Sequence, residues 1–271
     1  ENLTGMECEF IEASILDKEV LKRAMRGVDF VFHLAAFVSV SESVIQPVEC
    51  VTLNVNGLLN VLEAATSAQV KKLIFASSAA VYGSNTQLPN IETMRPEPQS
   101  PYAVTKLDGE YYCAIWQRQT ALQTACLRFF NVFGPRQDPN SSYAAALPVF
   151  IRNARNGAPI PIYGDGEQTR DFVYVKDVVD SMAHVCQTES LVETYNIGYG
   201  CSVSIQRLVE TILDATHSRS QIEFGPPRVG DVRHSCACVD KLWATGWQPP
   251  YGFEAGLDAT LDATLERGLD A

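Results

Sequence analysis

The stretch Lys71-Lys72-Leu73-Ile74-Phe75-Ala76-Ser77-Ser78 is a short apolar run that stops at two hydroxyl side chains. A run of this length, bounded by polar residues, is typical of a strand buried in a parallel sheet. In open α/β sheets, ligands lie beyond the carboxyl ends of such strands. The pattern therefore predicts that Ser78 faces a cleft.

A helix is expected shortly after this strand, in Ser100-Pro101-Tyr102-Ala103-Val104-Thr105-Lys106. Serine is a favoured N-cap and proline is favoured in the first helical turn, so the helix should begin after Ser100. Tyr102 and Lys106 are then four residues apart on one helical face. One strand end and one helix can thus bring Ser78, Tyr102 and Lys106 together.

The spacing Tyr-xxx-Lys alone is a weak signal, because the chain has ten tyrosines. A tyrosine of ordinary pKa, about 10, is a poor base at neutral pH. A lysine one turn away, together with a nicotinamide cation, would lower that pKa and allow the phenolate to remove a hydroxyl proton as hydride leaves the same carbon. The alternative interpretation is an exposed tyrosine beside a solvated lysine.

Apolar runs that look like strands alternate with helical patterns through the first half of the chain. The expected strands are 8–12, 28–36, 73–76 and 124–130, and the expected helices are 17–26, 44–68 and 101–119. Such alternation predicts an α/β fold with a doubly wound parallel sheet and right-handed crossovers.

The character of the sequence changes from about Gly134, where proline and glycine are more frequent and the elements are shorter. Helices are expected at 144–156, 175–187, 204–216 and 253–267, and strands at 159–163 and 195–197. This half is interpreted as a smaller α/β lobe that closes over the ends of the parallel strands.

Composition excludes several classes of function. The formal net charge of −11 argues against a nucleic-acid or anionic-membrane partner. An anionic ligand must therefore be bound by locally placed Arg or Lys. The eight cysteines include no CxxC and no zinc spacing, so reduced structural thiols and no metal site are expected. There is no apolar run of about 18 residues and no signal peptide, which favours a soluble, cytoplasmic protein.

Five motifs in order resemble the extended short-chain dehydrogenase/reductases. They are His33-Leu34-Ala35-Ala36, Asn54-Val55-Asn56-Gly57, Ser77-Ser78-Ala79-Ala80-Val81-Tyr82-Gly83, Tyr102-Ala103-Val104-Thr105-Lys106 and the stretch 128–135, Arg-Phe-Phe-Asn-Val-Phe-Gly-Pro. Three later stretches, 136–139, 164–172 and 228–235, are similar to those of the NAD-dependent nucleotide-sugar 4-epimerases. The resemblance implies a Rossmann-like NAD-binding domain in 1–133 with parts of 172–200. It implies that 134–171 and 201–271 bind the nucleotide sugar.

The resemblance also assigns roles to residues. Tyr102 would be the acid/base at the sugar 4-hydroxyl, Lys106 would hold the nicotinamide ribose and lower the tyrosine pKa, and Ser78 would hydrogen-bond the same hydroxyl. Besides Tyr102 and Lys106, NAD would contact Ser14, Ile15, Leu34, Ala35, Ala36, Asn54, Ala76, Ser77 and Phe129. The UDP-sugar would contact Val38, Ser39, Ser78, Asn131, Tyr163, Arg170, Arg228, Asp231 and Ser235, whose arginines supply the required positive charge.

Three positions refine the expected reaction. In such epimerases the residue at Ser235 is either bulky or small, and a small one leaves room for an N-acetyl group. UDP-N-acetylglucosamine is therefore the preferred substrate over UDP-glucose. Ala79 and Ala80 stand where 4,6-dehydratases have an Asp-Glu pair, which argues against dehydration.

The helices 44–68 and 101–119 resemble the pair that forms the homodimer interface in this family.

The chain departs from the family at its beginning. The family's first strand, glycine-rich phosphate turn and second strand are not in this sequence, and the acidic residue near the adenine falls at Ser14. In the strand order 3-2-1-4-5-6, the two absent strands would lie between strands 8–12 and 28–36. Two alternatives to a 4-epimerase follow: a non-catalytic fragment that binds a UDP-sugar, and a 4-reductase or decarboxylase on the same fold.

Overall fold

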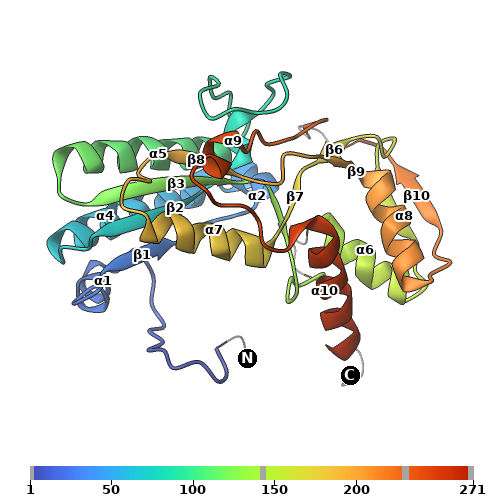
Figure 1. Ribbon diagram of the computed structural model, residues 1–271, viewed down its shortest axis with the longest axis horizontal. Coiled ribbons are helices and arrows are strands. Elements are labelled where there is room, and N and C mark those ends of the chain that lie inside the picture. Colours follow the sequence, from blue (N-terminus) through green and yellow to red (C-terminus); the bar gives the residue numbers. More distant parts are fainter. Residues whose placement is uncertain (1–2, 141–144, 228–231, 268–271) are drawn as a thin grey trace.

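The computed structural model describes residues 3–140, 145–227 and 232–267. Its central feature is a parallel sheet (Figure 1), which in the described residues has the order β1-β2-β3-β8. These strands are β1 (Phe30–His33), β2 (Lys72–Ser78), β3 (Gln123–Phe129) and β8 (Thr194–Ile197). All three pairings are parallel, and Ser78 lies in register with Phe129. The carboxyl ends of the strands therefore meet at one edge of the sheet, as the sequence predicts.

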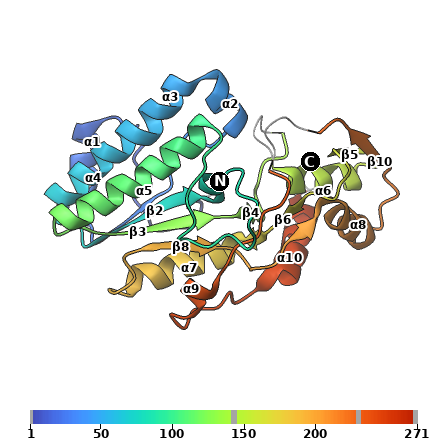
Figure 2. The ribbon, with the colours of Figure 1, turned by 90° about the horizontal axis from the view of Figure 1, so that it is seen from above.

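Helices cover both faces of this sheet (Figure 2). The helices α4 (Gly57–Ser67) and α5 (Pro101–Gln119) lie on one face, and α7 (Val175–Gln187) lies on the other. The short helix α1 (Lys18–Ala24) packs on α4, and its N-cap Asp17 accepts hydrogen bonds from the amides of Glu19 and Val20. Buried side chains of the strands, such as Leu73 and Leu127, join the two helical layers. The predicted doubly wound α/β class is confirmed.

The single helix predicted at 44–68 is broken into several pieces. They are α2 (Val40–Ile45), α3 (Pro47–Val51), a π-helical turn (Thr52–Asn56) and α4. Pro47 has no amide hydrogen and its ring clashes with the preceding turn, so a new helix begins there. π-helical turns are frequent at functional sites, and this one contains Asn54.

The second half of the chain has a hydrophobic core of its own, which includes Phe133, Phe150, Leu208 and Leu257. The elements around it are α6 (Ala146–Arg155), β5 (Ile160–Tyr163), α8 (Ile205–Thr216), β10 (Ile222–Gly225) and α10 (Gly252–Arg267). Strands β5 and β10 pair in parallel. The domain boundaries given above stay a prediction.

Short elements connect the two cores. They are the 3₁₀ turn η2 (Ala79–Tyr82), β4 (Asn131–Phe133) paired with β7 (Phe172–Tyr174), β6 (Thr169–Arg170) paired with β9 (Val203–Ser204), and α9 (Asp240–Trp243). The sequence did not predict these pairs, because strands of two or three residues are too short to show a period of two.

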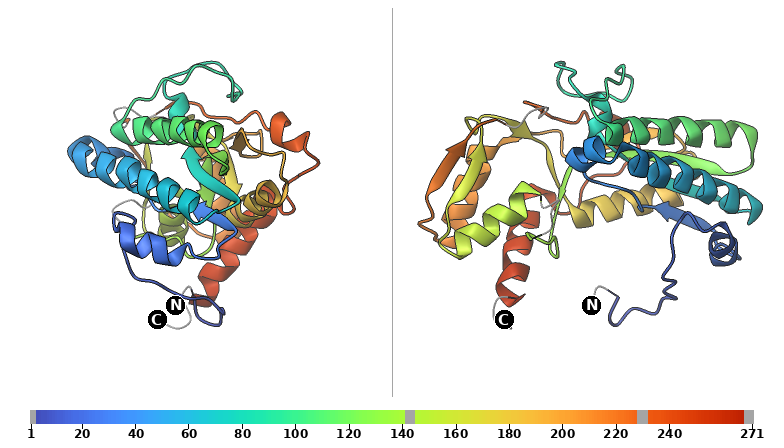
Figure 3. Two further views of the ribbon diagram at one scale, coloured as in Figure 1. Left: turned by 90° about the vertical axis from the view of Figure 1, so that its left-hand side faces the viewer. Right: turned by 180° about the vertical axis from the view of Figure 1, so that it is seen from behind.

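The strand predicted at 8–12 is wrong. These residues have no regular secondary structure, and Figure 3 shows the segment extended outside the layers. Phe10 is 68% exposed, and on the open edge of the sheet Phe32 of β1 is 44% exposed. An alternating pattern forms a strand only where a neighbouring strand satisfies its backbone groups. The placement of two further strands beside β1 stays a prediction.

Two searches of the described residues gave negative results. None of the helices there is long and apolar enough to cross a membrane. None of the groups of His, Cys, Asp and Glu there has an arrangement that could hold a metal ion.

Candidate active site

Ser78 and Tyr102 meet at the carboxyl edge of the sheet. Ser78 ends β2, and its Oγ accepts a hydrogen bond from the amide of Ala80 at 3.1 Å, which starts the η2 turn. Ser100 caps α5 through its Oγ, which accepts from the amide of Ala103 at 3.1 Å. These two caps bring the Tyr102 phenol within hydrogen-bonding reach of Ser78. The helix start predicted at Ser100 is confirmed.

Lys106 lies one turn further along α5 and is 5% exposed. Its Nζ donates to the carbonyl oxygen of Ala76 at 2.7 Å and lies 5.7 Å from the centre of the Tyr102 ring. Burial lowers the pKa of this ammonium to about 8. Among the described residues, Ala76 is the one hydrogen-bond acceptor of Lys106, so two further N–H donors remain for ribose hydroxyls.

The pKa of the Tyr102 phenol is raised, chiefly because burial disfavours the phenolate, and the hydrogen bond to Ser78 opposes this shift. Tyr102 is therefore protonated at neutral pH in the protein alone. The lowering of this pKa by Lys106 and a nicotinamide cation together stays a prediction.

Asn54 connects the loop after β1 to the helix α5. Its Oδ1 accepts from the amide of Phe37 at 2.6 Å, and its Nδ2 donates to Thr105 Oγ1 at 2.9 Å. Thr105 in turn donates to the carbonyl oxygen of Tyr102 at 2.8 Å. The predicted cofactor residues Leu34, Ala35 and Ala36 lie in this loop, and the first two are exposed.

The Ser77 hydroxyl faces a buried ion pair. It donates to Glu110 Oε1, and Glu110 binds Arg128 through two hydrogen bonds of 2.9 and 2.7 Å. Ser77 can therefore offer a cofactor its backbone but not this hydroxyl. The sequence analysis missed Glu110 and Arg128, although an arginine inside an apolar strand is the kind of signal that predicts a buried partner.

The other predicted cofactor residues lie in different surroundings. Phe129 is half-buried at the end of β3, beside Ser78. Ser14 is exposed, and its Oγ accepts from the amide of Leu16 at 3.2 Å. Ile15 packs on the start of α4, where Gly57 leaves room for it: a Cβ there would lie 2.4 Å from Ile15 Cδ1.

Several of the predicted substrate residues lie near strand β6 and the residues that flank it, and we call this group the second wall of the candidate site. The amide of Ser235 donates to the carbonyl oxygen of Thr169 at 3.2 Å, which places Ser235 beside the β6 strand of Arg170. The amide of Asn131 donates to the carbonyl oxygen of Asp171 at 2.9 Å. Tyr163 lies at the end of β5 and is 41% exposed.

The remaining substrate residues are less directly placed. Ser39 is buried as the N-cap of α2, and its Oγ accepts from the amide of Glu42 at 3.1 Å. Val38, just before it, is exposed. Arg228 and Asp231 lie outside the described residues.

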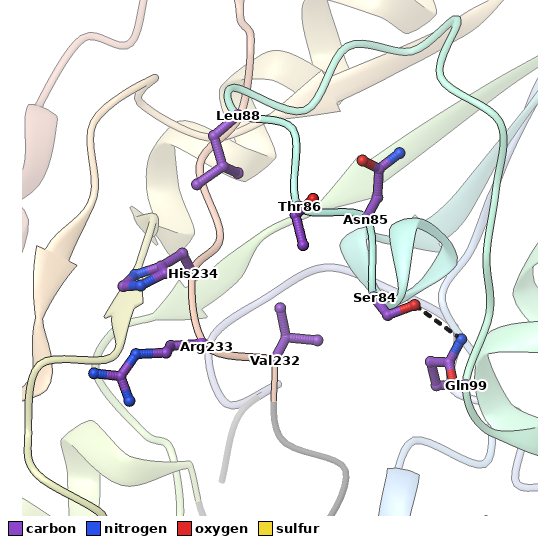
Figure 4. Close-up of a pocket in the computed structure, with 8 residues that line it drawn as sticks. All are labelled: Ser84, Asn85, Thr86, Leu88, Gln99, Val232, Arg233 and His234. Atoms are coloured by element: carbon purple, nitrogen blue, oxygen red, sulfur yellow. Dashed lines mark hydrogen bonds between the residues drawn. The ribbon is translucent and has the colours of Figure 1, made fainter.

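A pocket of about 370 Å³ lies between the loop after η2 and the segment 232–234 (Figure 4), and the sequence analysis did not predict it. The side chains that line it are Ser84, Asn85, Thr86, Leu88, Gln99, Val232, Arg233 and His234. One wall is formed by residues that lie between Ser78 and Tyr102 in the chain, and the other by the residues just before Ser235. Most of the lining residues have polar side chains, but the exposed surface of the pocket is mainly apolar, and Arg233 is paired with Asp165 at 2.8 Å.

Comparisons with known proteins agree with this geometry. The profile of the NAD dependent epimerase/dehydratase family matches residues 1–198. The chain belongs to this family. The UDP-glucose 4-epimerase of Mycolicibacterium smegmatis is 36% identical over 266 residues, which are 95% of this chain and 84% of that protein.

Two solved structures of similar proteins are also epimerases. A UDP-N-acetylglucosamine 4-epimerase from Methanobrevibacter ruminantium, in complex with UDP-N-acetylmuramic acid, is 37% identical with a TM-score of 0.91, covering 95% of this chain and 83% of its own. A UDP-glucose 4-epimerase from Thermotoga maritima, with UDP-glucose, is 35% identical with a TM-score of 0.94, covering 98% and 87%. The predicted family and Rossmann-like fold are confirmed.

As a member of the epimerase/dehydratase family, the protein is an NAD-dependent enzyme. The described residues fit the nicotinamide end of this cofactor. Lys106 has donors available, and Leu34 and Ala35, which follow the end of β1, are exposed.

Proposed function

We propose that the protein catalyses the NAD-dependent 4-epimerisation of a UDP-sugar, with UDP-N-acetylglucosamine and UDP-N-acetylgalactosamine as the preferred pair. The observation that supports this most strongly is the arrangement of Ser78, Tyr102 and Lys106 at one edge of the parallel sheet. It provides a proton acceptor, a hydroxyl partner and a cation within one small volume.

Each of these residues has a distinct task in the proposed reaction. NAD, when bound, would supply a hydride acceptor for C4 of the sugar and the hydride for the return transfer to the other face of the ring, and its positive ring would favour the phenolate of Tyr102. Tyr102 takes the proton of the sugar 4-hydroxyl and gives it back when the 4-keto group is reduced. Ser78 hydrogen-bonds the same oxygen and keeps it near the phenol. Lys106 holds the ribose hydroxyls with its remaining donors.

The choice of sugar rests on Ser235 and on a relative. Ser235 is small and half-buried, beside the β6 strand of Arg170, so it leaves space for an acetamido group. The similar protein from Methanobrevibacter ruminantium is named a UDP-N-acetylglucosamine 4-epimerase. The uridine diphosphate is assigned to Asn131, Tyr163, Arg170, Arg228 and Asp231.

The test uses the full-length protein with UDP-N-acetylglucosamine and NAD. We expect UDP-N-acetylgalactosamine to form without net consumption of NAD, and Tyr102→Phe to abolish this conversion while it still binds the nucleotide sugar. Turnover retained in Tyr102→Phe would overturn the assigned base. Net consumption of NADH with a 4-keto sugar nucleotide would instead indicate a 4-reductase, and release of carbon dioxide from a UDP-uronic acid would indicate a decarboxylase. Sugar-nucleotide binding without turnover would indicate a non-catalytic protein.

The same proposal includes a homodimer in the cytoplasm. Exposed apolar side chains gather on α2 and α3, next to the N-terminal half of α5: Val40, Val44, Ile45, Val48, Val51 and Val104. A second copy of the chain would cover this surface. It lies on the helices that the sequence analysis assigned to the dimer interface.

A further inference from the structure

Asp171 is a fully buried carboxylate at the start of β7 that binds three separate segments. Its Oδ1 accepts from the amide of Tyr199 at 2.8 Å, and its Oδ2 accepts from the amides of Gly200 and Ala237, each at 3.0 Å. Its own carbonyl oxygen accepts from the amide of Asn131. One residue thus joins the start of β4, the loop after β8 and the segment that returns from the second core.

These hydrogen bonds lie next to the proposed substrate residues. Asn131 is bonded to Asp171 directly, Arg170 precedes it in the chain, and Ser235 is two residues before the bonded Ala237. We propose that Asp171 is a positioning residue: its carboxylate fixes Ala237 and with it the place of Ser235 beside the nucleotide sugar, while its backbone holds Asn131. The inference rests on the proposed function and extends it to a residue that does not touch the substrate.

The packing around Asp171 leaves its carboxylate little freedom to move. A Cβ added at Gly198 would lie 2.8 Å from Ala237 Cβ and 2.9 Å from Asp171 Oδ2, so the three segments touch without room for a methyl group. A small change of the carboxylate therefore shifts the segment that leads to Ser235.

Asp177 provides a matched control on the other side of β7. It is equally buried and also accepts three hydrogen bonds, from the Tyr199 hydroxyl and from the amides of Tyr251 and Gly252. The two amides lie at the start of α10, and Asp177 shares Tyr199 with Asp171 through the ring hydroxyl and not through the amide. Loss of Asp177 should weaken the fold without moving the second wall of the site.

The experiment compares Asp171→Asn and Asp177→Asn in the full-length protein with NAD. An Asn places an NH₂ group where one oxygen accepted a backbone N–H, so at least one hydrogen bond is lost. For Asp171→Asn we expect KM for UDP-N-acetylglucosamine and Kd for UDP to rise about tenfold, with kcat within about threefold. For Asp177→Asn we expect a fall in Tm similar to that of Asp171→Asn, while KM and Kd stay within about twofold of the wild-type values.

The proposal is overturned if Asp171→Asn lowers Tm as much as Asp177→Asn but leaves KM and Kd unchanged, or if the wild-type protein binds no UDP. If Asp171→Asn is not recovered folded, Gly198→Ala makes the same test by displacing the carboxylate, with the same expected and contrary results. If no UDP-sugar is turned over but Asp171→Asn still weakens UDP binding selectively, the positioning role stands and the proposed reaction fails.

Discussion

The Lys106 ammonium donates a hydrogen bond to the carbonyl oxygen of Ala76, so the cation of the site is fastened to the central strand β2. A buried charge that is bonded in this way stays in place before any ligand arrives. It also has an energetic cost, because the pKa of Lys106 falls to about 8 on burial.

The first prediction concerns this cost and its pH dependence. The folded-state pKa lies below the unfolded value of 10.5, so the penalty for the charged lysine is fully present below about pH 8 and disappears as pH rises towards 10.5. Lys106→Met should therefore raise the free energy of unfolding at pH 7 by about 1–3 kcal/mol and change it little near pH 10.5. Denaturant unfolding at both pH values checks this. An equal effect of Lys106→Met at the two pH values would contradict the lowered pKa of Lys106.

The second prediction concerns the buried pair of Glu110 and Arg128. Glu110→Gln leaves the guanidinium, with an exposed side-chain fraction of 5%, without its anion. Glu110→Gln should therefore lower the free energy of unfolding by about 3–5 kcal/mol. Glu63→Gln, which breaks the exposed pair with Lys18, is the control and should change stability by less than about 1 kcal/mol. Similar losses in both variants would show that burial is not the cause.

The third prediction concerns the close approach of α5 to β2. A Cβ at Gly109 would lie 2.3 Å from Phe75 Cζ, so it would overlap with the Phe75 ring. Gly109→Ala should destabilise the protein by about 1–3 kcal/mol, although alanine favours a helix. Gly225→Ala, whose Cβ would meet its nearest atom at 3.6 Å, should be nearly neutral. A stabilised Gly109→Ala variant would mean that α5 can move away from the sheet.

The fourth prediction concerns the apolar surface of α2 and α3. Val48 is 78% exposed, and Val48→Glu should convert a dimer to a monomer without lowering Tm by more than a few degrees. Val179→Glu, on α7, makes the same change on a surface outside the proposed interface. Sedimentation velocity distinguishes the two variants. A dimer that survives Val48→Glu would place the interface elsewhere.

Much of the fold could be predicted from sequence because its signals are local. The helix α5 begins at the Ser100-Pro101 cap, and α7 has the predicted bounds Val175–Gln187. The family motifs likewise lie within short segments, so they indicated the family and the pairing of Ser78 with Tyr102. The break at Pro47 had a local signal too, but the strong helical period on either side of it outweighed that signal.

The rest depends on contacts between distant segments. Whether 8–12 forms a strand depends on a neighbouring strand, and the partners of Asp171 lie 28 to 66 residues away in the chain. The Ser77 hydroxyl binds Glu110, 33 residues later. No periodicity or cap can show such pairings, since they arise only once the chain is folded.

The connection from Asn54 through Thr105 to the Tyr102 carbonyl has a consequence for redesign. It couples the loop after β1 to the helix α5, which carries the proposed acid/base Tyr102, so a substitution in either one disturbs both. A designer who wants the protein to accept another sugar should leave the loop after β1 and α5 unchanged and vary residues 232–235 instead. Specificity can change there while the distance between proton acceptor and cofactor is kept.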